Sequence, residues 1–259
     1  MYYWGGVKVT NIMLILAGLF LPLFPLSMVF NTVFSRIEKP YQRIVLLMLW
    51  PQIGLLLVHL SDVSIPSWVV TWGILTAFFY AFRLLTIREL GLWASFLATS
   101  AWALLWVTIL HDGESPFYLY ALGFSVPLSL LVFLNKELTD RFGAAYVGLY
   151  QGLAQTQPRI SGILVMVLLA VIATPIFPSF FTMLHTIISA TPGSFVTVVL
   201  ACFVWLLWSW AACRVMAGLI VGPATAFDVP DLTIATTWKY SGVIVSLIIL
   251  SLILIGGMP

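Results

Sequence analysis

The chain has 259 residues, of which 62% are apolar and 8% charged, and its mean hydropathy is +1.10. So few polar side chains cannot cover a water-facing surface, which excludes an ordinary soluble domain. The net charge of +2 is too small to indicate nucleic acid binding. Charge-free stretches such as residues 9–35 exceed the roughly 20 residues that one spanning helix needs, so we expect an integral membrane protein.

The apolar runs are continuous rather than alternating, which favours spanning helices over a barrel. We therefore predict a single transmembrane domain, residues 1–259, that is an all-α polytopic bundle of about eight transmembrane helices. The predicted spans cover residues 9–33, 44–60, 66–87, 90–110, 117–134, 160–190, 194–215 and 240–256.

Two stretches depart from a simple spanning helix. The sixth span contains Pro175 and Pro178, and proline removes a backbone donor and clashes with the preceding turn, so this helix is predicted to break there. Residues 216–227, with Gly218, Gly222 and Pro223, are apolar but poor in helix formers. We expect an interfacial or re-entrant segment there, with a ninth helix as the alternative.

Lys and Arg gather in alternate loops. They occur in the 34–43, 83–89 and 135–159 loops and flank the last loop as Arg214 and Lys239, whereas the intervening loops carry Asp62 or the pair Asp112 and Glu114. By the positive-inside rule the first set faces the cytoplasm. We therefore predict a multi-pass protein of the inner (cytoplasmic) membrane with both termini on the outer side, which requires an even number of spans.

Residues 135–158 are predicted to form a cytoplasmic amphipathic connector. This loop mixes charged side chains, such as Lys136 and Arg141, with apolar ones, such as Phe142 and Leu149. Such spacing is typical of a short helix that lies at the membrane interface, and a docking surface for a partner is the alternative.

The eleven tryptophans fall mostly near the predicted ends of spans. Tryptophan is enriched at membrane–water interfaces, so an aromatic belt accounts for them without a cofactor. The examples that motivate this interpretation are Trp4, Trp68, Trp102, Trp106 and Trp238.

Four segments read GLFLPLFP (18–25), TIRELGLWAS (86–95), GLAQTQPR (152–159) and ATPIFPSFF (173–181). Together they resemble antiporter-like membrane subunits, the superfamily of respiratory complex I, cation/proton antiporter complexes and inorganic-carbon-accumulating complexes. Residues 152–159, GLAQTQPR, resemble the family's G-G-L-x-x-x-x-P-R loop, and residues 173–181, ATPIFPSFF, are similar to its L-A-G-L-P-P-x-x-G-F helix break. Residues 18–25 resemble the first helix, and residues 86–95 resemble the entry to a later one. These segments occur in the family's order, in a chain far shorter than a full subunit.

The departures from the family concern its titratable residues. The family keeps a His and a Lys on the helix before the G-G-L loop, but residues 120–129 carry no ionisable group apart from tyrosine. It also places a Lys or Glu just after the helix break, where this chain has Thr182 and Met183. A proton relay needs ionisable groups at depth, so we do not expect a complete proton path within this chain.

The remaining ion-path candidates are His185, close to where the family keeps its ionisable group, and His59 with Asp62 at the outer end of the second span. The alternatives are a hydrogen-bonded histidine near the interface and an ordinary polar helix end. Arg83 and Arg214 are partner-facing candidates, and the alternative for both is a stem that snorkels to the headgroups.

The sequence thus predicts a shortened antiporter-like subunit of an ion-motive-force-coupled complex. It would dock against other membrane or peripheral subunits, or complete a proton path, rather than conduct alone. Inorganic carbon accumulation is the preferred system; the alternatives are a respiratory or hydrogenase complex I-like subunit and a self-sufficient transporter of ions or small solutes. A further alternative is an intramembrane enzyme built on His59 and Asp62. We expect lipid contact, no nucleic acid, no cofactor, no metal and no catalysis by the chain alone, because no nucleophile–base arrangement or metal-ligand spacing occurs.

Overall fold

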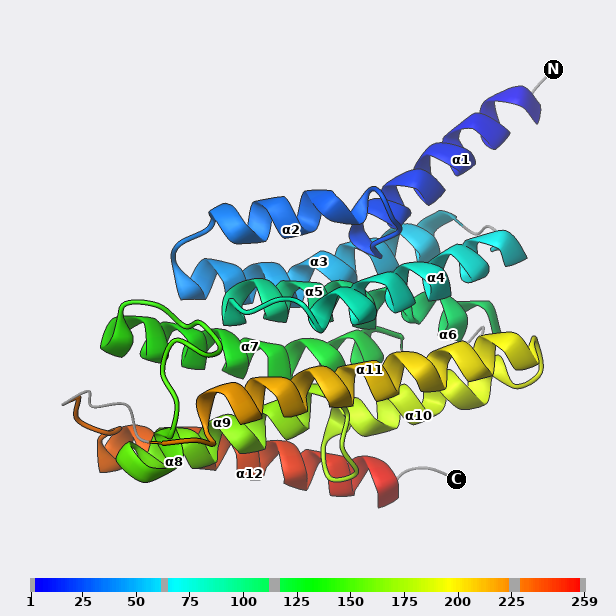
Figure 1. The fold of residues 1–259 in the computed structure, drawn as a ribbon. Helices are drawn as coiled ribbons and strands as arrows, with labels where there is room; N and C mark the ends of the chain where they lie inside the picture. The colour runs from blue at the N-terminus through cyan, green and yellow to red at the C-terminus, as the bar shows by residue number, and fades with distance from the viewer. Residues whose placement is uncertain (1–2, 62–64, 112–116, 224–228, 257–259) are drawn as a thin grey trace.

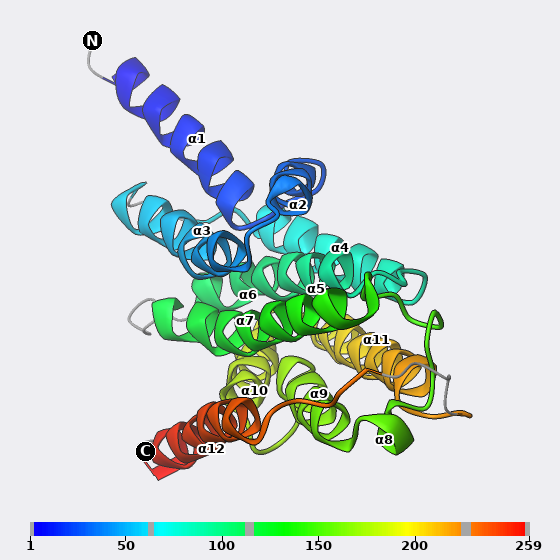
Figure 2. The same cartoon turned by 90° about the vertical axis from the view of Figure 1, so that its left-hand side faces the viewer.

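The computed structural model describes residues 3–61, 65–111, 117–223 and 229–256. It is 79% helical, without a strand in the described residues, so the predicted all-α bundle is confirmed (Figures 1 and 2). The helices are α1 (Tyr3–Phe20), α2 (Ser27–Arg36), α3 (Pro40–Ser61), α4 (Ser67–Leu84), α5 (Leu90–Ala103), α6 (Leu105–His111), α7 (Phe117–Phe142), α8 (Leu153–Thr156), α9 (Pro158–Val171), α10 (Pro178–Ala190), α11 (Phe195–Leu219) and α12 (Ile234–Gly256).

The chain crosses the bundle eight times in the described residues. Six crossings are helical stretches long and apolar enough to span a membrane: α3, α4, α5 with α6, α7, α11 and α12. The other two are broken pairs, α1 with α2 and α9 with α10. Both ends of the chain consequently lie at the same end of the bundle, on the right in Figure 1, as an even number of crossings requires.

The break in the sixth predicted span is present, but the first predicted span is broken as well. Residues 9–33 were expected as one helix, whereas α1 ends at Phe20 and α2 begins at Ser27. Pro22 and Pro25 lie between them, and each proline removes a backbone donor. The glycine at position 54 of α3 makes room for this break, because a Cβ there would lie 2.8 Å from the backbone nitrogen of Leu21.

The helix α5 is the centre of the bundle. In the apolar membrane-spanning stretch formed by α5 and α6, 83% of the residues are buried inside the protein. The corresponding share is 22% for α3 and 17% for α12. Trp93 and Trp102 of α5 are fully buried. The outer helices therefore present most of their apolar surface outward, where a bilayer or a partner subunit would cover it.

The predicted connector differs from the structure in its first part. Residues 135–142 continue α7 instead of starting a separate amphipathic helix. The reason is that Leu138 extends the buried stripe formed by Leu131 and Leu134, so the helix gains packing by continuing. An irregular segment, residues 143–152, and the single turn of α8 complete the connector, whose cytoplasmic location stays a prediction.

The loop of residues 152–159, which resembles the G-G-L-x-x-x-x-P-R motif, leads into α9, and the start of α9 is hydrogen-bonded to the segment before α12. Gly152 adopts a left-handed conformation with φ of 73°, and Pro158 occupies the first turn of α9, where its missing N–H costs nothing. The Asp231 carboxylate accepts from the backbone nitrogens of Arg159 (2.9 Å) and Ile160 (3.2 Å). An acidic side chain at this position satisfies free N–H groups and complements the helix dipole.

The predicted irregular segment 216–227 begins later than expected, because α11 continues to Leu219. Residues 220–223 follow it with a turn at Gly222, whose φ is 117°. The rest of this segment, and with it part of the question of a ninth helix, lies outside the described residues, as do Asp62, Asp112 and Glu114.

Positive charge is concentrated at one end of the bundle. Of the eleven Lys and Arg residues, all except Lys8 lie at or near the end where α2 meets α3, α4 meets α5, and α7 leads to α9. This is the end opposite to the two termini (Figure 1). The distribution supports the predicted orientation, in which this end is cytoplasmic.

A reporter fused after Pro259 tests the orientation. At this position a reporter that matures only in the cytoplasm should be inactive, and a reporter that needs the outer compartment should be active. The reason is that the C-terminus lies opposite the basic end. Fusions after Arg36 should behave in the opposite way. Activity of the cytoplasmic reporter after Pro259 would contradict the orientation.

Candidate functional site

The break between α9 and α10 contains Pro175, ends at Pro178 and precedes His185, one of the ion-path candidates. Its free carbonyl groups are bound by the protein itself. The Thr174 hydroxyl donates to the Leu169 carbonyl (2.9 Å), the Ser179 hydroxyl to that of Ala170 (2.5 Å), and the Trp205 indole to that of Ile172 (2.9 Å). These three carbonyls thus already accept hydrogen bonds within the protein, so they are less exposed for coordination of an ion than the free carbonyls of an open break.

The break between α1 and α2 is closed in the same way, by indole groups. Three tryptophans donate to its carbonyls: Trp50 to Leu19 (3.3 Å), Trp106 to Leu21 (3.0 Å) and Trp72 to Phe24 (2.6 Å). The backbone nitrogen of Phe24 donates in turn to the Thr76 hydroxyl (3.1 Å). The first break is therefore closed by indole groups of neighbouring helices, and the second by two local hydroxyl groups and one indole from α11.

The aromatic-belt interpretation is wrong for two of the tryptophans, which lie in the core of the bundle. Trp102 and Trp106 are fully buried, and the Trp102 indole donates to the Ser125 hydroxyl (3.2 Å). Trp68 and Trp238 are largely exposed, as a belt requires, whereas the side chain of Trp4 lies outside the described residues. Span-end tryptophans and bundle-core tryptophans look alike in sequence because both lie in apolar surroundings.

The helices α7 and α10 are in contact within the two stretches to which the family resemblance assigns titratable residues. A Cβ on Gly123 of α7 would collide with the Thr182 hydroxyl of α10. The Thr182 hydroxyl donates to the Pro178 carbonyl (3.3 Å), and Thr186 donates to the Thr182 carbonyl (2.8 Å). A close contact between a glycine and a threonine thus fills the space in which a relay would need charged side chains.

The fully buried polar side chains of the described residues carry no charge. They are serines and threonines with Asn31 and Gln157. One group of them forms a network, in which Ser27 and the Tyr80 hydroxyl share a hydrogen bond (2.9 Å) and Thr99 donates to the Asn31 amide oxygen (3.2 Å). Neutral groups of this kind hold helices together but do not store a proton at neutral pH.

His185 lies on α10, two turns after the break, and is half-buried. Its ring stacks on that of Tyr120 of α7, with the centroids 4.4 Å apart. The structure therefore brings this candidate next to the α7 segment that the resemblance singled out. A role in an ion path stays a prediction.

The other predicted site residues are spread over the surface. His59 is exposed in the last turn of α3, and its predicted companion Asp62 lies outside the described residues. Arg83 is exposed in the last turn of α4. Arg214 is exposed on α11 and donates from Nη1 to the carbonyl of Leu85, the residue that caps α4. That contact fastens α11 to α4, and contact of either arginine with a partner stays a prediction.

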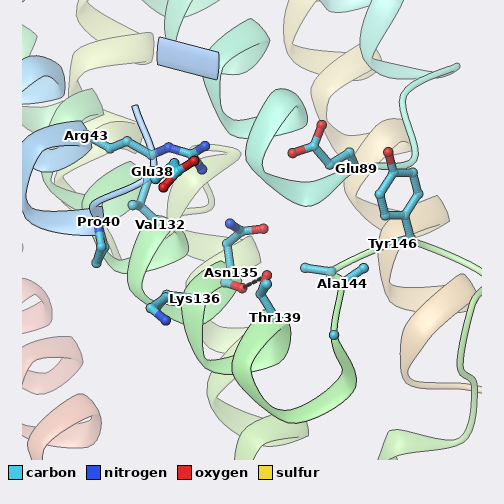
Figure 3. Close-up of a pocket in the computed structure, with 12 residues that line it drawn as sticks. Glu38, Pro40, Arg43, Glu89, Val132, Asn135, Lys136, Thr139, Ala144 and Tyr146 are labelled. Carbon is cyan, nitrogen blue, oxygen red and sulfur yellow. Dashed lines mark hydrogen bonds between the residues drawn. The ribbon is translucent and has the colours of Figure 1, made fainter. Parts of the chain in front are cut away.

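Sequence reasoning missed a charged cavity at the basic end. It has a volume of about 280 Å³ and lies between the α2–α3 link, the start of α5 and the end of α7. Figure 3 shows Arg43 and Glu89 approaching its centre from opposite sides, with the Asn135 amide between them and Glu38 beside Arg43. These residues come from three segments far apart in sequence, so no local motif reveals them.

Gly91 keeps the centre of this cavity open. A Cβ there would lie 3.1 Å from Arg43 Nη1, 3.2 Å from Glu89 Oε1 and 3.4 Å from Asn135 Nδ2. The half-buried Arg43 is held by a hydrogen bond from its Nε to the Ile37 carbonyl (2.7 Å) and by the Phe34 ring, 5.1 Å from the guanidinium carbon. Three polar groups thus converge on a point that glycine leaves empty.

Comparison with known proteins finds similarity at the level of structure. No family model and no curated protein matches the chain. A chain of respiratory complex I from Thermus thermophilus with bound NADH matches with a TM-score of 0.84 at 18% identity, over 94% of this chain and 54% of that one. A chain of the Mrp complex from Dietzia sp. DQ12-45-1b gives 0.77 at 17%, over 86% and 44%. A chain of the membrane-bound sulfane sulfur reductase, an archaeal respiratory membrane complex, gives 0.78 at 15%, over 90% and 50%.

The chain has the fold of an antiporter-like membrane subunit. The predicted resemblance is confirmed in this respect. Identities below 20% show the fold alone, and the chain spans about half the length of the solved chains that it matches. Activity and partners therefore depend on the residues of this chain.

The Trp205 cap can be tested by Trp205→Phe, which removes the indole donor and keeps most of the packing. We expect a loss of about 1 kcal/mol in the free energy of unfolding, because the Ile172 carbonyl is left without its donor. Thermal unfolding in detergent measures this loss. Trp210→Phe, on the exposed side of the same helix, is the control and should change little. Equal midpoints for Trp205→Phe and the wild type would mean that the cap is dispensable.

The close contact of α7 and α10 can be tested by Gly123→Ala. The new methyl group must displace Thr182, and overpacking of this kind costs about 1–3 kcal/mol. Gly162→Ala on α9 is the matched control, because nothing lies within 4 Å of its Cβ position and alanine favours the helix. A Gly123→Ala protein as stable as Gly162→Ala would show that the helices are not in contact there.

Proposed function

We propose that this chain is a shortened antiporter-like subunit of an ion-coupled membrane complex, which docks against other subunits or completes an ion path instead of conducting alone. The fold supports the first half of this proposal, because chains of complex I and of the Mrp complex share it. The uncharged interior of the bundle supports the second half, namely that the chain does not conduct alone.

The observation that carries the proposal is the contact of Gly123 with Thr182. The family resemblance assigns titratable residues to these stretches of α7 and α10, and a pump that moves protons across lipid needs them. Here a glycine and a threonine meet, and the fully buried polar groups of the described residues are uncharged. A subunit that keeps the fold without those groups is best suited to bracing or docking.

The self-sufficient transporter is the weaker candidate. It would use the broken helix as its binding site, with free carbonyls at the half-helix ends. The carbonyls of Leu169, Ala170 and Ile172 are instead occupied by side chains of the same chain. No observation favours inorganic carbon over respiration, so this choice stays a prediction.

Affinity purification in mild detergent, with mass spectrometry of the co-eluting chains, tests the proposal. We expect membrane or peripheral subunits in fixed stoichiometry with this chain. A soluble zinc-binding partner would indicate inorganic carbon accumulation, and quinone-linked subunits would indicate respiration. A stable monomer without partners would contradict the proposal.

His185→Ala tests whether this chain contributes to the path of the assembled complex. If His185 completes a relay with a partner, ion transport by the purified complex should fall at least tenfold while the complex stays intact. His59→Ala, at an exposed helix end, is the control. Full transport by the His185→Ala complex would remove the relay role and leave docking as the function.

A further inference from the structure

The charged cavity at the basic end holds the opposite charges of Arg43 and Glu89 apart. Within the described residues, neither of the two takes part in an ion pair. Yet Arg43 Nη1 and Glu89 Oε1 lie 3.1 Å and 3.2 Å from the same point, the Cβ position of Gly91, and both side chains are half-buried. Half-buried charges that do not pair with each other are costly, so a ligand that contacts both would stabilise the site.

The Glu89 carboxylate does not serve the helix that it precedes. Glu89 is the N-cap residue of α5, where a carboxylate can accept from the first N–H groups of the helix and complement its dipole. Its side chain makes no such hydrogen bond and points into the cavity instead (Figure 3). The carboxylate is therefore placed to accept from a ligand.

The Arg43 guanidinium is fixed in position by contacts that use neither of its Nη groups. Its Nε donates to the Ile37 carbonyl, and the Phe34 ring lies against it. Nη1 faces the cavity, where the Asn135 amide is a second donor, 3.4 Å from the Cβ position of Gly91. A planar guanidinium with free N–H groups is well suited to a carboxylate, which it can bind through two parallel hydrogen bonds.

The other two charged residues of the cavity have weaker effects. Glu38 and Lys136 are exposed, and Lys136 is paired with Asp140. Water screens exposed charges, so the half-buried Arg43 and Glu89 dominate recognition. A simple anion would be repelled by Glu89 and a simple cation by Arg43, whereas a zwitterion has a favourable contact at each end.

The shape of the cavity favours a small zwitterion whose charges are close together. The two charged groups converge on one point, which suits an ammonium and a carboxylate attached to the same carbon atom, as in an α-amino acid. The volume of about 280 Å³ leaves space for a side chain. Pro40, Val132 and Ala145 contribute apolar parts of the wall, so a small apolar side chain matches it.

We propose that this cavity binds a free α-amino acid with a small apolar side chain. The carboxylate contacts Arg43 and the Asn135 amide, the ammonium contacts Glu89, and the side chain lies against Val132. The exposed Glu38 and its neighbours open the site to a water-soluble ligand. The site is separate from the contact of α7 with α10 on which the proposed function depends, so either proposal can fail without the other.

Binding of tritiated L-alanine to the purified full chain, measured by scintillation proximity in detergent, tests the site. We expect saturable binding of one molecule per chain. Propionate lacks the ammonium and ethylamine lacks the carboxylate, so each should compete at least tenfold more weakly than unlabelled L-alanine. An absence of saturable binding, or propionate that competes as well as L-alanine, would overturn the proposal.

Two variants locate the binding. Glu89→Gln removes the negative charge that attracts the ammonium, and Gly91→Ala keeps every charge but adds a methyl group where the polar groups converge. Each should weaken L-alanine binding at least tenfold, with the circular dichroism spectrum unchanged. Propionate should bind Glu89→Gln more tightly than it binds the wild type, because its carboxylate no longer meets a like charge. Undiminished L-alanine binding by a folded Glu89→Gln protein would overturn the assignment.

Each variant has a matched control. Glu137→Gln removes a carboxylate of α7 that does not line the cavity, and Gly162→Ala adds a methyl group where nothing lies within 4 Å. Both controls should bind L-alanine with the affinity of the wild type. A loss in Glu137→Gln as large as that in Glu89→Gln would assign the effect to net charge and overturn the proposed contact.

Discussion

The structure depends on the rule that a backbone carbonyl within a bilayer must find a donor in the protein. Two of the eight crossings are broken at prolines, and each break frees carbonyls that water cannot reach in lipid. Indole and hydroxyl groups supply the donors: Trp106 reaches the first break, and Trp205 and Ser179 reach the second. The cost of each break is thereby offset within the chain, by a donor from α6 at the first break and by donors from α10 and α11 at the second.

The same hydrogen bonds distinguish the broken helices of this chain from those that bind ions in transporters. A broken helix is useful to a transporter because its free ends can coordinate an ion. Here those ends are occupied, the Gly123–Thr182 contact fills the space between α7 and α10, and the buried polar groups of the described residues are neutral. The chain shares its fold with chains of complex I and of the Mrp complex, and its charged residues lie mainly at one end of the bundle.

The sequence predicted the class of fold, the number of crossings and the second break because these depend on local signals: apolar length, charge-bearing loops and the prolines at positions 175 and 178. The first break carries the same signal in Pro22 and Pro25, but the uninterrupted charge-free stretch around them favours one continuous helix. The indole caps could not be predicted, since Trp106 and its acceptor are 85 residues apart in sequence. The cavity was missed for the same reason: Arg43, Glu89 and Asn135 converge only after three helices pack together.

Proton flux through the isolated chain tests the central claim most directly. The purified protein would be reconstituted into vesicles that contain a pH-sensitive dye, and the decay of an imposed pH gradient would be followed with the membrane potential clamped by potassium and valinomycin. The account predicts a decay no faster than that of protein-free vesicles. A faster decay that His185→Ala abolishes would contradict it, because the chain would then contain a complete proton path of its own.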